Sequence, residues 1–287
     1  TRWAGIAAAL GVVGIVASLW LARTIDGGVG YLLETYLVSF AFFLSLSLGA
    51  LFFVMLHHVT RAGWSVVVRR IAEAMAANVW LMALLVLPIL FGVEHLYHWA
   101  HPGAAEHDAL IAGKVGFLNT TFFTIRVVLY FVIWSVLAWF FYATSKAQDA
   151  SGDPALTRRM EMLSAPGIVL FALSLNFAAF DLLMSLDFAW YSTIFGVYFF
   201  AGGLVGFYAL LTLFTLFAGW DAYNTVNHDT PSHEAMTIHK NWALATFGLF
   251  LLVSLWSVIK ARMAKQEGLP FLLILLLASA LLASTAW

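Results

Sequence analysis

Long apolar runs dominate this sequence and constrain its fold more than any other feature. Of the 287 residues, 63% are hydrophobic and 10% are charged, whereas a soluble domain carries about 25% charged residues. The runs are about 20 residues long, which is enough for a helix to cross the hydrocarbon core of a bilayer. They show no alternation of apolar and polar residues, so helices are favoured over a barrel. The sequence therefore predicts an all-α, polytopic membrane helical bundle that contacts the lipid bilayer.

Eight apolar segments are long enough to be membrane helices. They span residues 3–22, 33–57, 70–93, 117–143, 165–186, 190–217, 241–259 and 269–287. The first six are predicted to form one membrane bundle, residues 1–217. The remainder, residues 218–287, is a polar connection followed by a two-helix hairpin. Its change in composition marks it as a candidate separate module.

The basic residues predict an orientation, because short loops rich in Lys and Arg stay in the cytoplasm. One side of the membrane receives most of them: Arg2, Arg61, Arg69, Arg70, Lys146, Arg158 and Arg159. The opposite side receives Arg23 and Lys114. We therefore expect a cytoplasmic N-terminus. The last hairpin does not fit this orientation, since Lys260, Arg262 and Lys265 would then lie outside.

Net charge and cysteine content exclude several classes of function. The formal net charge is -1, so the chain as a whole has no affinity for nucleic acid. It contains no cysteine, which excludes disulfides, cysteine-ligated iron–sulfur clusters, covalently attached c-type haem and thiol catalysis. Any redox centre is therefore bound non-covalently or lies on another subunit.

Arg126 and Asp181 are the two ionisable residues that lie deepest within the apolar segments. A charged side chain near the centre of a membrane helix costs about 2.5 to 3.5 kcal/mol on insertion scales, so each one requires a partner or a role. Counted along their helices from the same membrane face, the two residues lie at matching depths. We therefore expect them to form an ion pair.

Polar residues on the same two helices support this pairing. Asn119, Arg126, Tyr130 and Trp134 are separated by seven, four and four residues, so they share one helix face. Ser174, Asp181 and Ser185 do the same on the next segment. Two such faces turned toward each other would form a hydrated seam. The pair could serve proton movement along this seam, or it could only neutralise charge and hold the helices together.

A second group of polar residues lies at the predicted cytoplasmic side. Arg69 and Glu73 are four residues apart, Asn78 lies about a turn further in, and His57 and His58 end the second segment. One interpretation is a helix start at the membrane boundary with a local ion pair. The other is that His57, Glu73 and Asn78 form a cytoplasmic proton entrance, because histidine titrates near neutral pH.

Two connections on the opposite side also carry ionisable groups. Glu94, His95, His98 and His101 follow the third segment at a spacing that metal ligands can adopt, but a solvated loop explains them, and no metal site is predicted. Asp187 is predicted to lie in a tight hairpin between the fifth and sixth segments, solvated at the outer surface and favouring the start of the sixth helix.

Several stretches match one known family. The most specific are GWSVVVRRIAE, residues 63–73, and DLLMSLDFAWYSTIFG, residues 181–196. Together with LNTTFFTIRVVLYFVIWSVLAWFF and SKAQDASGDPALTRRMEMLSAPG, they make the chain resemble the ActF-type, NrfD-like membrane subunits of bacterial alternative complex III. The similarity covers about residues 3–217, and the C-terminal hairpin departs from the family.

This resemblance implies an NrfD-like four-helix bundle core in a subunit of a quinol:cytochrome c oxidoreductase. Such a complex belongs to respiratory or photosynthetic electron transfer in the bacterial inner membrane. The implied partners are a sister NrfD-like quinol-binding subunit, an iron–sulfur subunit, multihaem and monohaem cytochrome c subunits, and a terminal oxidase. Iron–sulfur clusters and c-type haems are expected on those partners and no cofactor is expected in this chain, although its residues leave open whether a quinone binds here.

The leading hypothesis from the sequence is a subunit without a redox centre that contributes a proton path. The residues assigned to that path are Asp181, Arg126, Tyr130, Ser174, Glu73, His57, Asn78 and Asp187. Asp181 would exchange the proton, because Arg126 keeps it ionised. The alternative is a structural scaffold of the same complex. An independent transporter would require inverted repeats with broken midplane helices, and no clear repeat is present.

Overall fold

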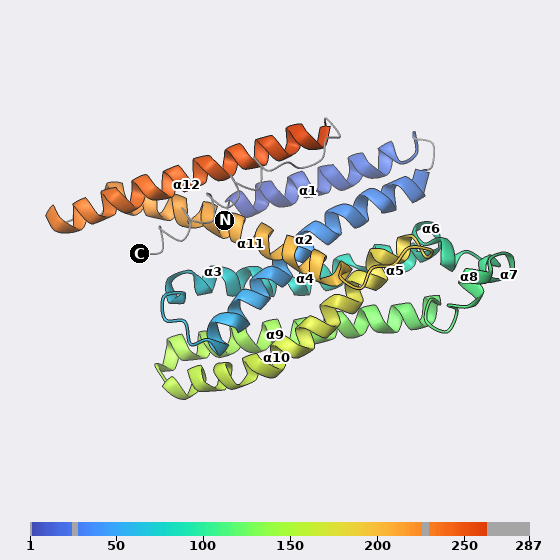
Figure 1. The fold of residues 1–287 in the computed structure, drawn as a ribbon, viewed down its shortest axis with the longest axis horizontal. Coiled ribbons are helices and arrows are strands. Elements are labelled where there is room, and N and C mark those ends of the chain that lie inside the picture. Colours follow the sequence, from blue (N-terminus) through green and yellow to red (C-terminus); the bar gives the residue numbers. More distant parts are fainter. Residues whose placement is uncertain (1, 25–27, 226–229, 263–287) are drawn as a thin grey trace. The chain divides into compact units, whose positions relative to one another are not determined.

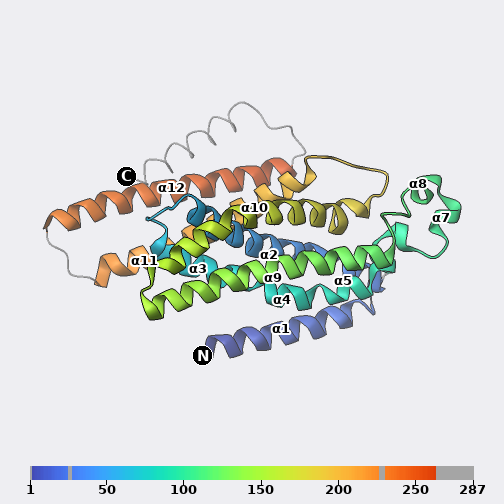
Figure 2. The same cartoon turned by 90° about the horizontal axis from the view of Figure 1, so that it is seen from below.

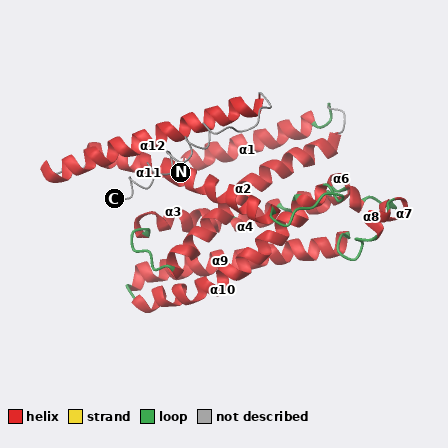
Figure 3. Cartoon of the chain, in the orientation of Figure 1, coloured by secondary structure: helices red, strands yellow, loops and turns green. Residues whose placement is uncertain are grey.

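The computed structural model describes residues 2–24, 28–225 and 230–262. The described residues form helices, turns and loops without a strand (Figure 3). The chain divides into two compact units, Thr1–Leu211 and Thr212–Trp287. This division lies inside the helix Phe195–Thr225. The eighth predicted segment, residues 269–287, lies outside the described residues, as do Lys265 and its neighbours in the last predicted connection.

Five helices within the described residues are long and apolar enough to cross a membrane. Their bounds are Gly28–Val59, Val66–Phe91, Thr120–Ser151, Pro154–Leu186 and Phe195–Thr225. They correspond to the second to sixth predicted segments. Two further helices, α1 (Arg2–Leu21) and α12 (Thr230–Arg262), overlap the first and seventh. Helix α12 begins within the stretch that was predicted to be a polar connection, before the predicted start at residue 241. The predicted all-helical class is therefore confirmed, and five of the eight predicted segments are helices that could span a membrane by their length and composition.

Four of these spans form the core of the first unit. They are α2 (Gly28–Val59), a broken helix comprising α3 (Val66–Ala77), α4 (Val79–Leu85) and α5 (Leu87–Phe91), α9 (Thr120–Ser151), and α10 (Pro154–Leu182). Helix α10 packs against both α2 and α9, and α3 and α4 pack against the same two helices from the other side (Figures 1 and 2). The result is a ring of four helices.

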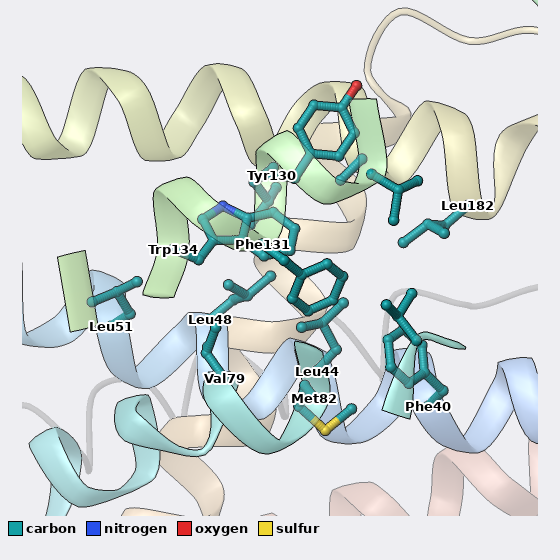
Figure 4. Close-up of a cluster of buried hydrophobic side chains, with 14 of the residues drawn as sticks. Phe40, Leu44, Leu48, Leu51, Val79, Met82, Tyr130, Phe131, Trp134 and Leu182 are labelled. Atoms are coloured by element: carbon teal, nitrogen blue, oxygen red, sulfur yellow. The ribbon is translucent and has the colours of Figure 1, made fainter. Parts of the chain in front are cut away.

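The centre of this ring is filled by large apolar side chains. Leu48 of α2, Val79 of α4 and Trp134 of α9 are at most 1% exposed. Figure 4 shows them within one cluster of buried side chains that also includes Leu44 of α2 and Phe131 of α9. Lipid tails are as apolar as these side chains, so close packing and polar contacts between helices stabilise such a bundle more than the hydrophobic effect does.

The span between Val66 and Phe91 is broken for an identifiable reason near Pro88. Proline has no backbone N–H and its ring crowds the preceding turn. At this point the Ile89 N–H donates to the Val86 carbonyl oxygen at 3.0 Å, three residues back. The Leu85 carbonyl instead accepts a hydrogen bond of 2.5 Å from the Tyr36 hydroxyl of α2. A neighbouring helix therefore satisfies the backbone group at the break, as a membrane interior requires.

Short helices and turns follow this span. They are α6 (Val93–Leu96), the 3₁₀ turn η1 (His98–Ala100), α7 (Ala104–His107) and α8 (Ala109–Ala112). Asp108 caps α8, since its carboxylate accepts a 2.7 Å hydrogen bond from the Leu110 N–H. The Lys114 ammonium then donates to the Phe188 carbonyl at 2.5 Å, which joins this connection to the one after α10.

Three consecutive residues, Gly152, Asp153 and Pro154, form the turn between α9 and α10. Gly152 ends α9 with a φ of 69°, a left-handed conformation that glycine adopts without steric cost. Asp153 then caps α10, accepting a 2.8 Å hydrogen bond from the Ala155 N–H, and Pro154 occupies the first helical position. These residues stop one helix and start the next, so α9 and α10 run antiparallel.

Helix α11 (Phe195–Thr225) begins after the turn η2 (Met184–Leu186) and a loop. Its N-terminal half approaches α2 very closely. A Cβ atom added at Gly203 would meet the Ser45 carbonyl oxygen at 2.8 Å, and one at Gly49 would meet the Gly203 carbonyl oxygen at 2.7 Å. Only glycine fits this crossing without displacing a backbone, which is a common way for membrane helices to pack.

The second unit contains the end of α11 and all described residues of α12. Within it, the Tyr223 hydroxyl lies 3.2 Å from the Thr237 hydroxyl. The Lys240 ammonium lies 3.9 Å from the centre of the Tyr223 ring. These contacts link the end of α11 to the first turns of α12.

Candidate functional site

The candidate site is centred on Asp181, in the last turn of α10. The residue is 0% exposed. Its Oδ2 atom accepts hydrogen bonds from Arg126 Nε at 2.8 Å and from the Tyr130 hydroxyl at 2.7 Å. Its Oδ1 atom accepts from Arg126 Nη2 at 2.8 Å. The predicted ion pair is therefore confirmed, and it is a two-point pair of the kind that is strongest between arginine and carboxylate.

Arg126 is surrounded on its remaining sides as well. Its Nη1 atom donates to the Phe117 carbonyl oxygen at 2.9 Å. The guanidinium carbon lies 3.8 Å from the centre of the Phe117 ring and 4.3 Å from that of Phe122. Carboxylate, carbonyl and two aromatic faces thus stabilise a positive charge that would otherwise be costly at this depth.

The polar faces predicted on the two helices meet through direct hydrogen bonds. One turn beyond Tyr130, the Trp134 indole N–H donates to the Ser174 hydroxyl at 2.8 Å. The Ser185 hydroxyl donates to the Asp181 carbonyl at 2.6 Å. Asn119 has a different role, because its side chain caps α9 by accepting a 2.8 Å hydrogen bond from the Phe122 N–H. Neighbouring side chains therefore occupy the hydrogen-bonding positions of the site.

A small cavity lies beside the site. Its volume is about 10 Å³, and its lining includes Phe40, Trp134 and Leu182. A buried water needs roughly 10 to 15 Å³ together with two to four polar partners. The lining of this cavity is apolar, so it does not supply those partners. The geometry here is that of a packed, hydrogen-bonded pair.

Two residues that complete the site, Tyr97 and Phe117, were not predicted from the sequence. Tyr97 is fully buried and its hydroxyl donates to the Leu182 carbonyl at 2.9 Å. Burial, and to a lesser extent the negative charge of Asp181, raise the pKa of this phenol. Both residues come from connections that bend back over the end of the bundle. The apolar residues between the histidines of EHLYHWAH were the available signal, since Leu96, Tyr97 and Trp99 are all buried.

The predicted cytoplasmic group is not one cluster. Glu73 is buried and pairs with Arg70 at 2.8 Å, and Arg70 also pairs with Asp149 of α9. The expected partner, Arg69, instead donates to the Ala62 carbonyl oxygen at 3.4 Å. The prediction of an Arg69–Glu73 pair is therefore corrected. Glu73 pairs with Arg70, three residues earlier, because Arg70 lies on the side of α3 that faces Asp149.

His57 and Asn78 each bond elsewhere. The Nδ1 atom of His57 is hydrogen-bonded to the Phe53 carbonyl oxygen at 2.8 Å within α2. The Asn78 amide donates to the Ser47 hydroxyl at 3.2 Å. Within the described residues, no hydrogen bond or ion pair joins His57, Glu73 and Asn78 to one another. His58 is also buried, and its Nε2 atom has no hydrogen-bond partner in the described part of the chain.

Asp187 organises a turn and not the start of a helix. Its Oδ1 atom accepts hydrogen bonds from the Ala189 N–H at 3.0 Å and the Trp190 N–H at 3.2 Å. Helix α11 begins only at Phe195. The expectation that Asp187 favours the start of the sixth helix is therefore corrected, because the local side-chain bonds hold residues 187–190 in a turn.

The histidine-bearing loop is exposed where the sequence predicted a solvated connection. Glu94, His95, His98 and His101 are all exposed. Among the described residues, no group of three or more His, Cys, Asp or Glu side chains is arranged to hold a metal ion. The His98 ring stacks on Phe188 with centroids 5.6 Å apart, which ties this loop to the one after α10.

No protein-family model matches the chain, and no curated protein sequence is similar to it.

Proposed function

We propose that the chain is a membrane subunit of a bacterial quinol:cytochrome c oxidoreductase of the alternative complex III type, and that it carries no redox centre. The observation that carries the proposal is the buried pair Arg126–Asp181, which lies between two membrane-spanning helices. These residues belong to the stretches in which the sequence resembles the NrfD-like subunits. The absence of cysteine supports placing iron–sulfur clusters and c-type haems on partner subunits.

Purification of the complex tests this proposal. The full chain would be tagged and purified in a mild detergent from the membranes in which it is naturally made. The proposal predicts that c-type haem absorbance, iron and an NrfD-like sister subunit elute with the chain, and that the preparation reduces cytochrome c with quinol. A chain that elutes without haem and without this activity would contradict the proposal.

Within such a complex, we propose that Asp181 exchanges protons. Support comes from its position inside a membrane span, where an ionisable group is a default functional candidate. The Tyr130 hydroxyl shares its Oδ2 atom with Arg126, so protonation of Asp181 would require only local rearrangement of these three side chains. Glu73 and His57 lie toward the other end of the bundle and would serve proton entry, with Asp187 at the outer mouth.

A second candidate function is that of a structural scaffold, and a specific observation favours it. Every hydrogen bond described at Asp181 is short, and the adjacent cavity is small and apolar. A scaffold predicts that joint replacement of Arg126 and Asp181 by neutral residues is tolerated, whereas either replacement alone reduces the yield of complex. A double variant that assembles fully and pumps normally would favour the scaffold, and one that assembles without pumping would favour proton exchange.

A further inference from the structure

A groove on the outside of the bundle, between α9 and α10, is a second candidate binding site. Its volume is about 380 Å³, and it is lined by Phe140 of α9 and by Arg159, Met162 and Leu163 of α10. It lies near the turn that joins the two helices, far along both helices from Arg126 and Asp181. The lining combines one cationic side chain with three apolar ones.

The groove lies at a membrane boundary. Residues 162–180 of α10 contain no charged side chain, and neither do residues 127–145 of α9. Each stretch is roughly 28 Å long at 1.5 Å per residue, which matches the hydrocarbon thickness of a bilayer. Arg159 stands just outside the first stretch, while Met162 and Leu163 are its first residues. One groove therefore spans the change from polar headgroups to acyl chains.

The charge of Arg159 is not neutralised by the described residues. Arg61, Arg70 and Arg126 each have a carboxylate partner. Within the described part of the chain, Arg159 has no ion pair, and its guanidinium carbon lies 5.5 Å from the centre of the Phe140 ring. The ring holds a positive charge at the groove, where it can receive an anion.

We propose that this groove binds an anionic phospholipid. Its phosphate would contact Arg159, and the part of its acyl chains nearest the headgroup would contact Met162, Leu163 and Phe140. Charge complementarity and the boundary position identify the occupant, since basic pockets beside membrane helices bind acidic headgroups. A free phosphate ion would leave the apolar lining without a contact. The proposal depends on the membrane spans and not on the proposed role in a quinol-oxidising complex.

Lipid binding to the purified full chain tests the proposal. The chain in detergent would be titrated with phosphatidylglycerol and, separately, with phosphatidylcholine of the same acyl chains, and bound lipid counted by native mass spectrometry. We expect a preference for phosphatidylglycerol that falls about fivefold in Arg159→Gln. Arg158→Gln, which removes an equal charge from an adjacent exposed residue outside the groove lining, should retain the preference.

A variant that keeps every charge provides the second arm. Leu163→Trp places a bulkier ring on the groove lining and should weaken the binding of both lipids, while it leaves the thermal unfolding of the chain unchanged. Equal losses in Arg158→Gln and Arg159→Gln, or equal wild-type affinity for the two lipids, would overturn the proposal. A photo-crosslinking residue at position 162, activated in native membranes, shows whether a lipid or a protein subunit occupies the groove. A lipid adduct supports the proposal, and an adduct with a protein subunit overturns it.

Discussion

Replacing Asp181 by Asn removes the carboxylate charge and leaves the Arg126 guanidinium buried without its counter-ion. Both side chains are at most 9% exposed, so water cannot substitute for the lost partner. Breaking a buried pair from one side costs about 3 to 5 kcal/mol. We therefore expect Asp181→Asn to lower the free energy of unfolding by about that amount. Denaturant titration of the purified chain in detergent measures it.

An exposed pair in the same protein provides the matched control. Arg61 and Glu161 lie 3.2 Å apart, but the Arg61 side chain is 78% exposed. Exposed pairs contribute about 0 to 1 kcal/mol. Glu161→Gln should therefore change the free energy of unfolding much less than Asp181→Asn. Equal losses in the two variants would show that burial does not set the cost at Asp181.

Tyr130 offers a smaller change at the same carboxylate. Tyr130→Phe removes one hydroxyl that donates to Asp181 Oδ2 and keeps the ring, whose centroid lies 6.2 Å from that of Trp134. Hydrogen bonds to charged groups contribute about 1.5 to 3 kcal/mol. Tyr36→Phe removes a hydroxyl that donates to a neutral carbonyl, so it should cost less. A larger loss in Tyr36→Phe would contradict this ranking.

At the scale of whole helices, the crossing of α2 and α11 depends on one side of α11. An added methyl at Gly203 would meet the Ser45 carbonyl oxygen at 2.8 Å, whereas one at Gly202 would meet no atom within 4 Å. Gly203→Ala should therefore lower the unfolding temperature, with an overpacking cost of about 1 to 3 kcal/mol. Gly202→Ala should leave it unchanged or raise it slightly, because alanine favours helix.

The two variants differ only in which side of α11 carries the methyl group. Thermal unfolding in detergent compares them directly. If Gly202→Ala were as destabilising as Gly203→Ala, the close approach to α2 would not explain the effect.

The helices that could be predicted from the sequence are those that depend on local sequence features. Apolar length located five spans, and Gly152, Asp153 and Pro154 are residue types that favour the end of one helix and the start of the next. The break at Pro88 was visible only as a proline near a helix end. Its consequence, a hydrogen bond from Tyr36 of another helix, depends on packing that a linear sequence does not display.

Only part of the candidate site could be predicted from the sequence. The helical rise fixes relative depth, so Arg126 and Asp181 could be paired by counting residues. Tyr97 and Phe117 could not be found in this way, because loops have no fixed rise and these two bend back over the bundle. The partner of Glu73 was missed because residues three and four apart share a helix face about equally well, and Asp149 of α9 favours Arg70.

At the scale of the whole molecule, the orientation in the membrane can be tested cleanly because the chain has no native cysteine. Single cysteines at Ala150 and Glu106 would lie on opposite sides, and both positions are exposed. A cytoplasmic N-terminus predicts that a membrane-impermeant thiol reagent labels Glu106→Cys in intact cells and labels Ala150→Cys only after permeabilisation. The reverse pattern would contradict the orientation derived from the basic residues.

We propose that the buried pair Arg126–Asp181 moves protons in an energy-converting complex, and the ratio of protons moved to electrons transferred distinguishes this role from that of a scaffold. The ratio would be measured in vesicles reconstituted with complex containing wild-type chain or the neutral double variant Arg126→Gln, Asp181→Asn, matched for assembled complex by haem content. If the pair moves protons, the variant complex transfers electrons with a reduced ratio of protons to electrons. An unchanged ratio in fully assembled variant complex would contradict it.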